Sequence, residues 1–473
     1  MNQSMLMDFY ELTMSNGYFN SPLKDTICYF DLFYRTNPKD GGYAIFCGLE
    51  SIVNYINELH FTKEDIEYLR SKNTFTEEFL EYLLNFKFKG DIYAFKEGSI
   101  IFPNEPILTI KATTIEAQII ETYLLLLVNH QSLIATTSKR IVESASGRPV
   151  LEFGSRRAHG SSAAILGARS AYIAGCVGTA CTITDQLYGV PALGTMAHSW
   201  VQMFDSEYEA FVEYCKRYPN NATLLVDTYD VLKSGIPNAI KAFDEVLKPL
   251  GITKCGIRID SGDITYLTNK ARKMLDAAGY TECTICISNS LDEYIIKDVL
   301  NQGAKIDVFG VGEKLITSKS DPVFGGVYKL VAIEKGNEIV PKIKKSENPI
   351  KITNPGYKKV YRIFEEDRMI ADLIALHDEV YDGKEPLTIF SEQQPWKKRT
   401  FTNYKIEEQH VLIFKDGVQV YDLPSTQEIK KYCDEQYNML WDEVKRFINP
   451  HNYYVDLSEK LYQLKYKMLS EIK

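Results

Sequence analysis

The chain has few of the features that mark membrane, secreted or nucleic-acid-binding proteins. Its longest apolar run, YLLLLV, is far shorter than the ~18–20 residues of a membrane helix. The N-terminal stretch MNQSMLMDFYELTM has neither the basic start nor the apolar core of a signal peptide. Acidic residues outnumber basic ones, 63 to 54, whereas a general nucleic-acid binder normally presents a net basic surface. We therefore expect a cytoplasmic protein without membrane or nucleic-acid partners, in which a local basic pocket for a small anion is still allowed.

Cysteine and histidine are sparse and scattered. The nine cysteines are odd in number and lack framework spacing, which favours reduced thiols in the cytosol. Cys283 and Cys286 form a C-x-x-C, but no second pair follows at zinc spacing, and the apolar run CTICIS predicts a buried strand. One of only seven histidines, His198, ends the apolar segment GTMAHS. A single histidine in such a place is more often structural than catalytic, so its role depends on its neighbours.

With 473 residues the chain is too long for one ordinary core, and its pattern of apolar and charged residues changes twice along the sequence. Residues 1–125 mix strand patterns with a helix that Thr62 caps, and GSIIFPNEPILTIKA suggests a hairpin. The stretch 113–145 has a long helical pattern. Residues 341–473 are rich in charge and loops, with a helical final forty residues. We predict an N-terminal α/β domain (1–125), a catalytic domain (126–340) and a C-terminal extension (341–473).

The middle region repeats a short apolar run, a polar end and a helical segment. This alternation predicts parallel strands joined by crossover helices. An open doubly wound sheet and a barrel both fit, but no G-x-G-x-x-G opens the first unit, which weakens a dinucleotide-binding fold. The number of repeats favours an irregular eight-stranded α/β barrel. The runs are PVLEFGSRR, GCVGTACT, PALGTMAHS, ATLLVDTYD, CGIRIDSGD, CTICISNS, KIDVFGVGEK and GGVYKLVAI.

Polar side chains gather where these strands end, which is where α/β barrels carry their chemistry. Arginines there suit carboxylate or phosphate, and carboxylates suit ribose hydroxyls or Mg²⁺. The loop FGVGEK offers backbone N–H groups that a phosphate can approach closely. Each element alone is weak: a Gly-x-Gly is more often a turn, and RIDSGD also suits a helix cap at Ser261 or Asp263. The strand-end set is Phe153, Arg156, Arg157, Thr179, Thr195, His198, Asp227, Asp230, Arg258, Asp260, Ser261, Asp263, Ser288, Asn289, Gly310 and Gly312.

Several segments together resemble the nicotinate phosphoribosyltransferase family. They are MDFYELTMSNGYF, LEFGSRRAHG, GTMAHSWVQMF, LLVDTYD, IRIDSGD, VFGVGEKLITS and SENPIKITNPGYKKVYR, in this order between residue 7 and about residue 363. The resemblance implies the irregular barrel of type II phosphoribosyltransferases, joined to an N-terminal α/β domain and a C-terminal extension. It also implies conversion of nicotinate and phosphoribosyl pyrophosphate (PRPP) to nicotinate mononucleotide and pyrophosphate. Coupled ATP hydrolysis through a phosphorylated histidine, here His198, and a requirement for Mg²⁺ belong to the same expectation.

The resemblance also assigns residues to ligands. Tyr10 and Phe153 would sandwich the pyridine ring, and because the Tyr10 position reaches into a neighbouring subunit, a homodimer with shared sites is implied. Thr195 and Arg258 would bind nicotinate, with Arg258 facing its carboxylate. The phosphoribosyl and pyrophosphate groups would be bound by Arg156 or Arg157, by Asp260, Ser261 and Asp263, and by the loop with Gly310, Gly312 and Glu313. Asp260 and Asp263 would also hold Mg²⁺.

One departure and several rivals accompany this assignment. Some relatives carry a threonine where this chain has Glu313. A carboxylate aimed at a phosphate would repel it, so either the Glu313 side chain turns away or the loop differs. GTACTI lacks the acid that amide-specific relatives place there, which favours nicotinate over nicotinamide. A transferase for nicotinamide or quinolinate is the near rival, and a non-catalytic metabolite-binding barrel the distant one. The acidic-pair PRPP loop is only faintly imitated by LLVDTYDVLKSG, which lacks its second acid and Thr-Gly.

Overall fold

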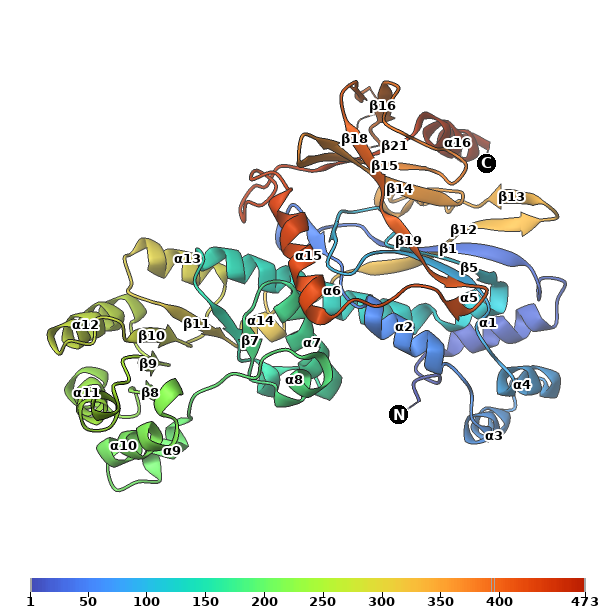
Figure 1. Cartoon of the computed structure of the whole chain (residues 1–473). Coiled ribbons are helices and arrows are strands. Elements are labelled where there is room, and N and C mark those ends of the chain that lie inside the picture. Colours follow the sequence, from blue (N-terminus) through green and yellow to red (C-terminus); the bar gives the residue numbers. More distant parts are fainter. Residues whose placement is uncertain (1, 393, 395, 472–473) are drawn as a thin grey trace. The chain divides into compact units, whose positions relative to one another are not determined.

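The computed structural model describes residues 2–392, 394 and 396–471. Backbone contacts group the chain into two compact units: Ile134–Pro322 form one, and Met1–Leu133 with Val323–Lys473 form the other. The beginning and the end of the chain, blue and red in Figure 1, thus belong to the same unit. The division into three domains stays a prediction. None of the helices in the described residues has both the length and the apolar character needed to cross a membrane.

The central unit is a mixed α/β fold around one parallel sheet. Its six strands lie in the order β7-β6-β11-β10-β9-β8, and every neighbouring pair is parallel. The strands are β6 (Val150–Glu152), β7 (Gly178–Thr179), β8 (Thr223–Leu225), β9 (Gly256–Ile259), β10 (Thr284–Ile287) and β11 (Val308–Val311). The helices are α7 (Ser161–Ile173), α8 (Thr182–Tyr188), α9 (His198–Gln202), α10 (Glu207–Arg217), α11 (Ile236–Ala242), α12 (Ile264–Ala277), α13 (Glu293–Asn301) and α14 (Glu313–Ile316).

The expected closure into eight strands is not confirmed, because two of the eight runs do not join this sheet. GGVYKLVAI forms β12 (Gly326–Lys335), which pairs antiparallel with β1 (Ile27–Tyr34) in the other unit. The run PALGTMAHS contributes a single parallel bridge between Ala192 and Thr179 at the edge of β7. Periodicity shows that a run is apolar and extended, but it does not show which sheet receives the run.

The parallel strands are apolar on both faces because helices cover them. Leu224, Ile257, Ile285 and Phe309, one from each of four strands, are fully buried in a single core. Cys283 and Cys286 are both buried, and Cys286 lies in β10, which confirms the expectation of a buried strand. Strand ends are therefore the first places along each run where a polar side chain reaches solvent.

The second unit is built on antiparallel pairing. A seven-stranded sheet has the order β13-β12-β1-β5-β3-β19-β20, and a six-stranded sheet has the order β17-β16-β21-β15-β14-β18. The strands not yet given are β2 (Ala44–Ile45), β3 (Asp91–Phe95), β4 (Ile100–Ile101), β5 (Leu108–Thr113), β13 (Glu338–Pro341), β14 (Lys358–Glu365), β15 (Arg368–Leu376), β16 (Leu387–Phe390), β17 (Lys398–Phe401), β18 (Lys405–Glu408), β19 (His410–Lys415), β20 (Val418–Gln419) and β21 (Tyr454–Leu457). The helices are α1 (Phe9–Phe19), α2 (Leu49–Glu58), α3 (Lys63–Ser71), α4 (Glu77–Leu84), α5 (Thr114–Ile119), α15 (Thr426–Asn438) and α16 (Glu459–Glu471), and α6 (Glu121–Ser144) has residues in both units.

Local sequence signals in this unit are partly confirmed. Thr62 does cap α3, in a capping box with Asp65. The helical pattern of 113–145 is confirmed but broken at Ile120 into α5 and α6. The hairpin expected in GSIIFPNEPILTIKA is wrong, because β4 pairs with β2 whereas β5 pairs with β1 and β3. The helical final forty residues are interrupted by β21.

Helix α1 is anchored by a buried acid, Glu11. Its Oε1 accepts hydrogen bonds from the Thr122 backbone N–H, at 3.0 Å, and from the Thr122 hydroxyl, whereas Oε2 has no partner among the described residues. Burial is the main reason that the pKa of Glu11 rises to about 8. The folded protein therefore holds a proton on Glu11 that the unfolded chain has lost, and this contribution to stability fades as pH rises from about 4.5 to about 8.

Glu11→Gln should remove this pH dependence. We expect the variant to gain stability relative to the wild type as pH rises from 5 to 8, by at most ~1.4 kcal/mol per pH unit, and to gain no more above pH 8. Urea denaturation at a series of pH values measures the gain, with the exposed Glu58→Gln on α2 as the matched control. A constant difference between Glu11→Gln and wild type across this range would contradict the burial argument.

Candidate functional site

Six of the side chains expected at strand ends surround one cavity of about 380 Å³ in the central unit. They come from the turn after β6, the segment before α9, and β9 with the turn that follows it. The parallel sheet brings these segments to one edge because the carboxyl ends of its strands all point the same way. The six are Phe153, Arg156, Thr195, His198, Arg258 and Asp260, and Ala180 and Leu225 also line the cavity.

Arg258 is the best-fixed cation of the cavity. It lies on β9, and only 13% of its side chain is exposed. Its Nη1 donates to Thr195 Oγ1 at 2.7 Å and to the Met196 carbonyl at 3.2 Å, and its Nε donates to Ser288 Oγ at 2.8 Å. Asp260 Oδ1 lies 3.4 Å from Nη2 and accepts the Ser288 hydroxyl at 2.5 Å. A guanidinium held by so many partners cannot rotate away, so it presents a fixed positive charge to a ligand.

His198 is the first residue of α9 and faces two carboxylates. Its Nδ1 lies 3.2 Å from Thr228 Oγ1. Its Nε2 lies 3.9 Å from Asp227 Oδ1 and 3.8 Å from Asp260 Oδ2, beyond direct hydrogen bonding. One ring nitrogen is therefore held by a hydroxyl, and the other is directed at a space between two acids.

Asp227 is the most buried of these acids, with 1% of its side chain exposed. Its Oδ2 accepts from the Asp260 backbone N–H at 3.1 Å and from the Ser261 hydroxyl at 2.6 Å. Its Oδ1 has no hydrogen-bond partner among the described residues. A buried carboxylate oxygen without a donor suits a cation or a ligand hydroxyl. The Asp227–Asp260 pair therefore fits Mg²⁺, an ion that takes one or two carboxylates and keeps several waters.

Asp263 is already engaged in the fold. Its Oδ1 accepts the Tyr266 backbone N–H at 2.7 Å, which caps α12. Neither Asp263 nor Ser261 lines the cavity, and both are exposed. Asp263 therefore has the role of a helix cap, one of the two roles expected for RIDSGD. Of Asp260, Ser261 and Asp263, only Asp260 lines the cavity.

Phe153 supplies an aromatic wall, and Gly310 makes room for it. A Cβ on Gly310 would lie 2.6 Å from two carbons of the Phe153 ring, a distance that real contacts do not reach. The Arg258 guanidinium carbon lies 5.7 Å from the centre of the same ring. Gly310 was expected to approach a phosphate; the structure gives it a second reason to be glycine, namely contact with the ring.

The two neighbouring arginines have different surroundings. Arg156 lines the cavity with His198, whereas Arg157 lines a separate cavity of about 360 Å³ with Glu313 and Lys319. Glu313 Oε1 lies 2.7 Å from Lys319 Nζ, and this ion pair lowers the pKa of the carboxyl. The Glu313 side chain is thus turned toward a lysine, and Gly312, directly before α14, keeps its backbone accessible.

Two contributors escaped the sequence analysis. Glu152, fully buried at the end of β6, accepts the Gly154 backbone N–H and the Thr179 hydroxyl, the latter at 2.6 Å, and so fixes the turn that carries Phe153. Thr228 orients His198. Glu152 could have been predicted, because it is an acid inside the apolar run PVLEF and a buried charge needs partners. Thr228, in VDTYD, had no comparable signal.

Tyr10 belongs to the other unit. It lies in the first turn of α1, and 45% of it is exposed. Leu6, Phe9 and Met14 beside it are exposed by 39%, 51% and 38%. This end of the chain therefore presents an apolar surface that the described residues of its own unit do not cover.

Fold and cavity together define a class: α/β proteins with a cavity at the carboxyl ends of parallel strands, here lined by two arginines and an aromatic ring. The chain belongs to the nicotinate phosphoribosyltransferase family. Its residues 5–129, 149–361 and 357–465 match the models of the N-terminal domain, the family itself and the C-terminal domain of nicotinate phosphoribosyltransferase.

Individual relatives extend this match over the whole chain. Nicotinate phosphoribosyltransferase of Bacillus subtilis (strain 168) is 42% identical, over 99% of this chain and 96% of the relative. The protein of the same name from Caenorhabditis elegans is 34% identical, over 98% and 92%. The crystal structure of human nicotinic acid phosphoribosyltransferase superposes with a TM-score of 0.87 at 27% identity, covering 98% of this chain and 99% of that one.

Gly310→Ala should displace the Phe153 ring, because the new methyl group would overlap it. We expect a loss of stability of ~1–3 kcal/mol, as for other overpacked sites. Phe153→Ala in the same chain should recover much of this loss, since it removes the overlapping ring. Chemical denaturation of the two single variants and the double variant measures the coupling, with Gly17→Ala, whose Cβ would meet open space, as control. Additive losses would show that the two residues do not compete for space.

Proposed function

We propose that this protein is a nicotinate phosphoribosyltransferase that forms nicotinate mononucleotide and pyrophosphate from nicotinate and PRPP, with coupled ATP hydrolysis. The observation that carries the proposal is the fixed Arg258 guanidinium beside the Phe153 ring, in the same cavity as His198 and Asp260. The 42% identity to the Bacillus subtilis enzyme over nearly the whole chain supports the same reaction.

The cavity offers a complementary group for each part of nicotinate. The pyridine ring stacks on Phe153, and the carboxylate faces Arg258. Thr195 Oγ1 accepts from Arg258, so the proton of its hydroxyl is free for the ligand's carboxylate. Ala180, from GTACTI, lines the cavity without adding an acid, which again favours the anionic base over its amide.

Transfer of the ribosyl group needs negative charge near the sugar and positive charge near the leaving group. As the bond to pyrophosphate breaks, the ribose carbon gains oxocarbenium character, which Asp260 and the buried Asp227 stabilise. Arg156, on the cavity wall, pairs with the departing pyrophosphate. Mg²⁺ held by Asp227 and Asp260, directly or through water, would neutralise pyrophosphate charge. Asp263 remains a candidate for the ion only if it leaves its position as the cap of α12.

His198 is the nucleophile toward ATP in this proposal. With the proton on Nδ1 donated to Thr228 Oγ1, the Nε2 lone pair attacks the γ-phosphorus. A P–N bond forms, the bond to the ADP oxygen breaks, and ADP leaves with that electron pair. The new phosphoryl group lies near Asp227 and Asp260, so a cation between them is needed to limit repulsion. Hydrolysis of this phosphohistidine then completes each cycle.

We further propose a homodimer in which Tyr10 completes the ring site of the neighbouring subunit. The exposed apolar residues around Tyr10 support an interface, because such clusters on a surface usually mark contact sites. We place the enzyme in the cytoplasm, since its nine cysteines are odd in number and lack the spacing of a disulfide framework.

His198→Ala tests the coupling to ATP. With PRPP, Mg²⁺ and nicotinate, we expect wild type to release ADP and to form product faster when ATP is present. The variant should retain a basal rate but show no ATP stimulation and no phosphorylated intermediate, because no nucleophile remains. Chromatography of nicotinate mononucleotide and ADP measures both. Equal ATP stimulation in the variant would eliminate this role for His198.

Arg258→Gln tests the base specificity. Loss of the charge-assisted contact should raise the KM for nicotinate by about tenfold or more, while the KM for PRPP changes less. Arg217→Gln, on the exposed side of α10, is the matched control. Because Arg156 puts a second guanidinium on the cavity wall, quinolinate should be assayed in parallel. Turnover of quinolinate or nicotinamide in preference to nicotinate by wild type would contradict the proposed substrate.

A further inference from the structure

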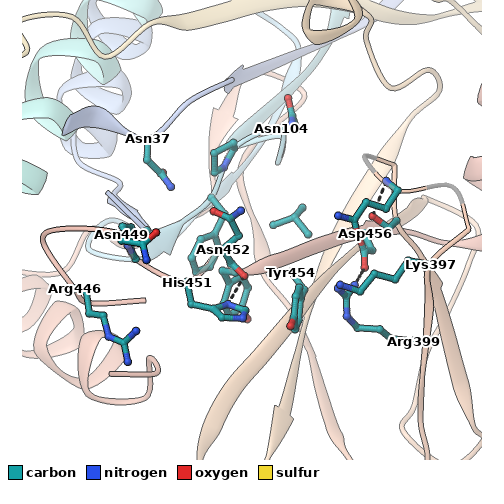
Figure 2. A pocket seen from close by; sticks show the side chains of 18 residues that line it. Asn37, Asn104, Lys397, Arg399, Arg446, Asn449, His451, Asn452, Tyr454 and Asp456 are labelled. Atoms are coloured by element: carbon teal, nitrogen blue, oxygen red, sulfur yellow. Dashed lines mark hydrogen bonds and ion pairs between the residues drawn. The ribbon is translucent and has the colours of Figure 1, made fainter. Parts of the chain in front are cut away.

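The unit that contains both chain ends has a cavity of its own, of about 510 Å³. Four stretches of chain form it: the segment before β2, the segment after β4, the strand β17 with the residues before it, and β21 with the loop before it. Figure 2 shows Asn37 and Asn104 on one side, Asn449 and Asn452 on a second, and Lys397 with Arg399 opposite them. A volume of this size is typical of sites for small organic ligands rather than for single ions.

The floor of the cavity is rigid. The rings of Phe102 and Tyr453 are stacked with centroids 3.7 Å apart and nearly parallel. The Tyr453 hydroxyl donates to Asp372 Oδ1 at 2.9 Å, and Asp372 forms a fully buried ion pair with Arg362 at 2.6 Å. A cavity whose floor is tied to the core in this way is already formed before a ligand arrives, which lowers the entropic cost of binding.

Its charges leave an excess of cations. The buried Asp456 is paired with Arg399, whose guanidinium carbon also lies 3.4 Å from the centre of the Tyr454 ring. Burial raises the pKa of Asp456, and Arg399 and Lys397 act in the opposite direction. Lys397 interacts with Asp456, which Arg399 already pairs, so three cations (Lys397, Arg399 and Arg446) share one carboxylate among the described residues that line the cavity. Arg446 is half exposed and lies 3.8 Å from Glu443, a weak pair at the rim.

Three of the lining side-chain amides have no hydrogen-bond partner among the described residues. Among the described residues, the side-chain amides of Asn104, Asn449 and Asn452 make no hydrogen bond, although all three line the cavity. Asn104 and Asn449 have positive φ, 69° and 51°, so each is held at a turn with its side chain beside the opening. Amides that combine a donor and an acceptor suit sugar hydroxyls or the edge of a base.

We propose that this cavity binds a phosphate ester of nucleotide type, with the phosphate at Lys397, the sugar or base against the asparagines, and Arg446 beyond them on the far side of the cavity. The cations select an anion, the amides select a ligand that has hydroxyl or ring nitrogen groups, and the volume exceeds that of a free phosphate. Among the described residues that line the cavity only Asp456 carries a carboxylate, and Arg399 already pairs with it, which favours an anionic ligand over a metal ion. All of these residues belong to the unit that contains both chain ends, whereas His198 belongs to the central unit.

The test is the binding of AMP to the whole enzyme by equilibrium dialysis, in wild type and in the double variant Lys397→Gln/Arg446→Gln. We expect the number of AMP molecules per chain to fall by one, or AMP affinity for one class of site to weaken at least tenfold. Lys398→Gln/Lys405→Gln is the matched control, because it removes two exposed lysines of the same sheet that do not line the cavity. Unchanged AMP binding in the first variant would overturn the proposal.

A second variant and two competitors sharpen the result. Asn104→Asp adds a negative charge at the wall with almost no change in shape, so it should weaken AMP binding while the thermal midpoint stays near that of wild type. Ribose 5-phosphate should displace AMP from this class of site at least tenfold better than inorganic phosphate does. Equal displacement by inorganic phosphate would show a site for a free anion only and would contradict the nucleotide assignment.

Discussion

A guanidinium on a central strand must be satisfied from every side, and the candidate site follows from that constraint. Arg258 lies on β9, in a sheet whose neighbouring positions are fully apolar. Leaving its charge unpaired there would cost several kcal/mol, so Thr195, Met196, Ser288 and Asp260 converge on it. Those contacts bring the segment before α9 to the end of β9, and the segment carries His198 with it.

The same contacts explain why acid, base and aromatic ring share one small space. Asp260 is held by Ser288 and in turn donates its backbone N–H to Asp227, so the two carboxylates beside His198 have fixed positions. Glu152 accepts the backbone N–H of Gly154 and thereby fixes the turn after β6 that contains Phe153. Glu152 holds the turn of Phe153, Thr228 holds His198, and Ser288 holds both Arg258 and Asp260. None of these three partners lines the cavity, which is how preorganised sites are built.

The residue types of this site could be predicted from the sequence, whereas the directions of their side chains could not. Arg258, Asp260 and His198 could be singled out because a polar residue at the end of an apolar run must lie at a sheet edge. Sequence spacing does not fix the direction of a side chain. It therefore could not show whether Asp263 of RIDSGD binds a ligand or caps a helix, or whether Arg156 or Arg157 lines the cavity. The prediction of a barrel failed to place β12 in the right sheet. The apolar alternation of β12 suits a parallel or an antiparallel partner equally, and the partner strand, β1, lies far earlier in the sequence. Gly310 shows the same limit, since its closest neighbour, Phe153, is remote in sequence.

The most direct measurement is a crystal structure of the enzyme with nicotinate mononucleotide bound. We expect the pyridine ring to lie against Phe153, its carboxylate within hydrogen-bond distance of Arg258 and Thr195, and the ribose beside Asp260. A pyridine ring bound elsewhere, with Arg258 still directed only at Thr195, Ser288 and Asp260, would contradict this expectation and would leave Arg258 a structural residue of the sheet.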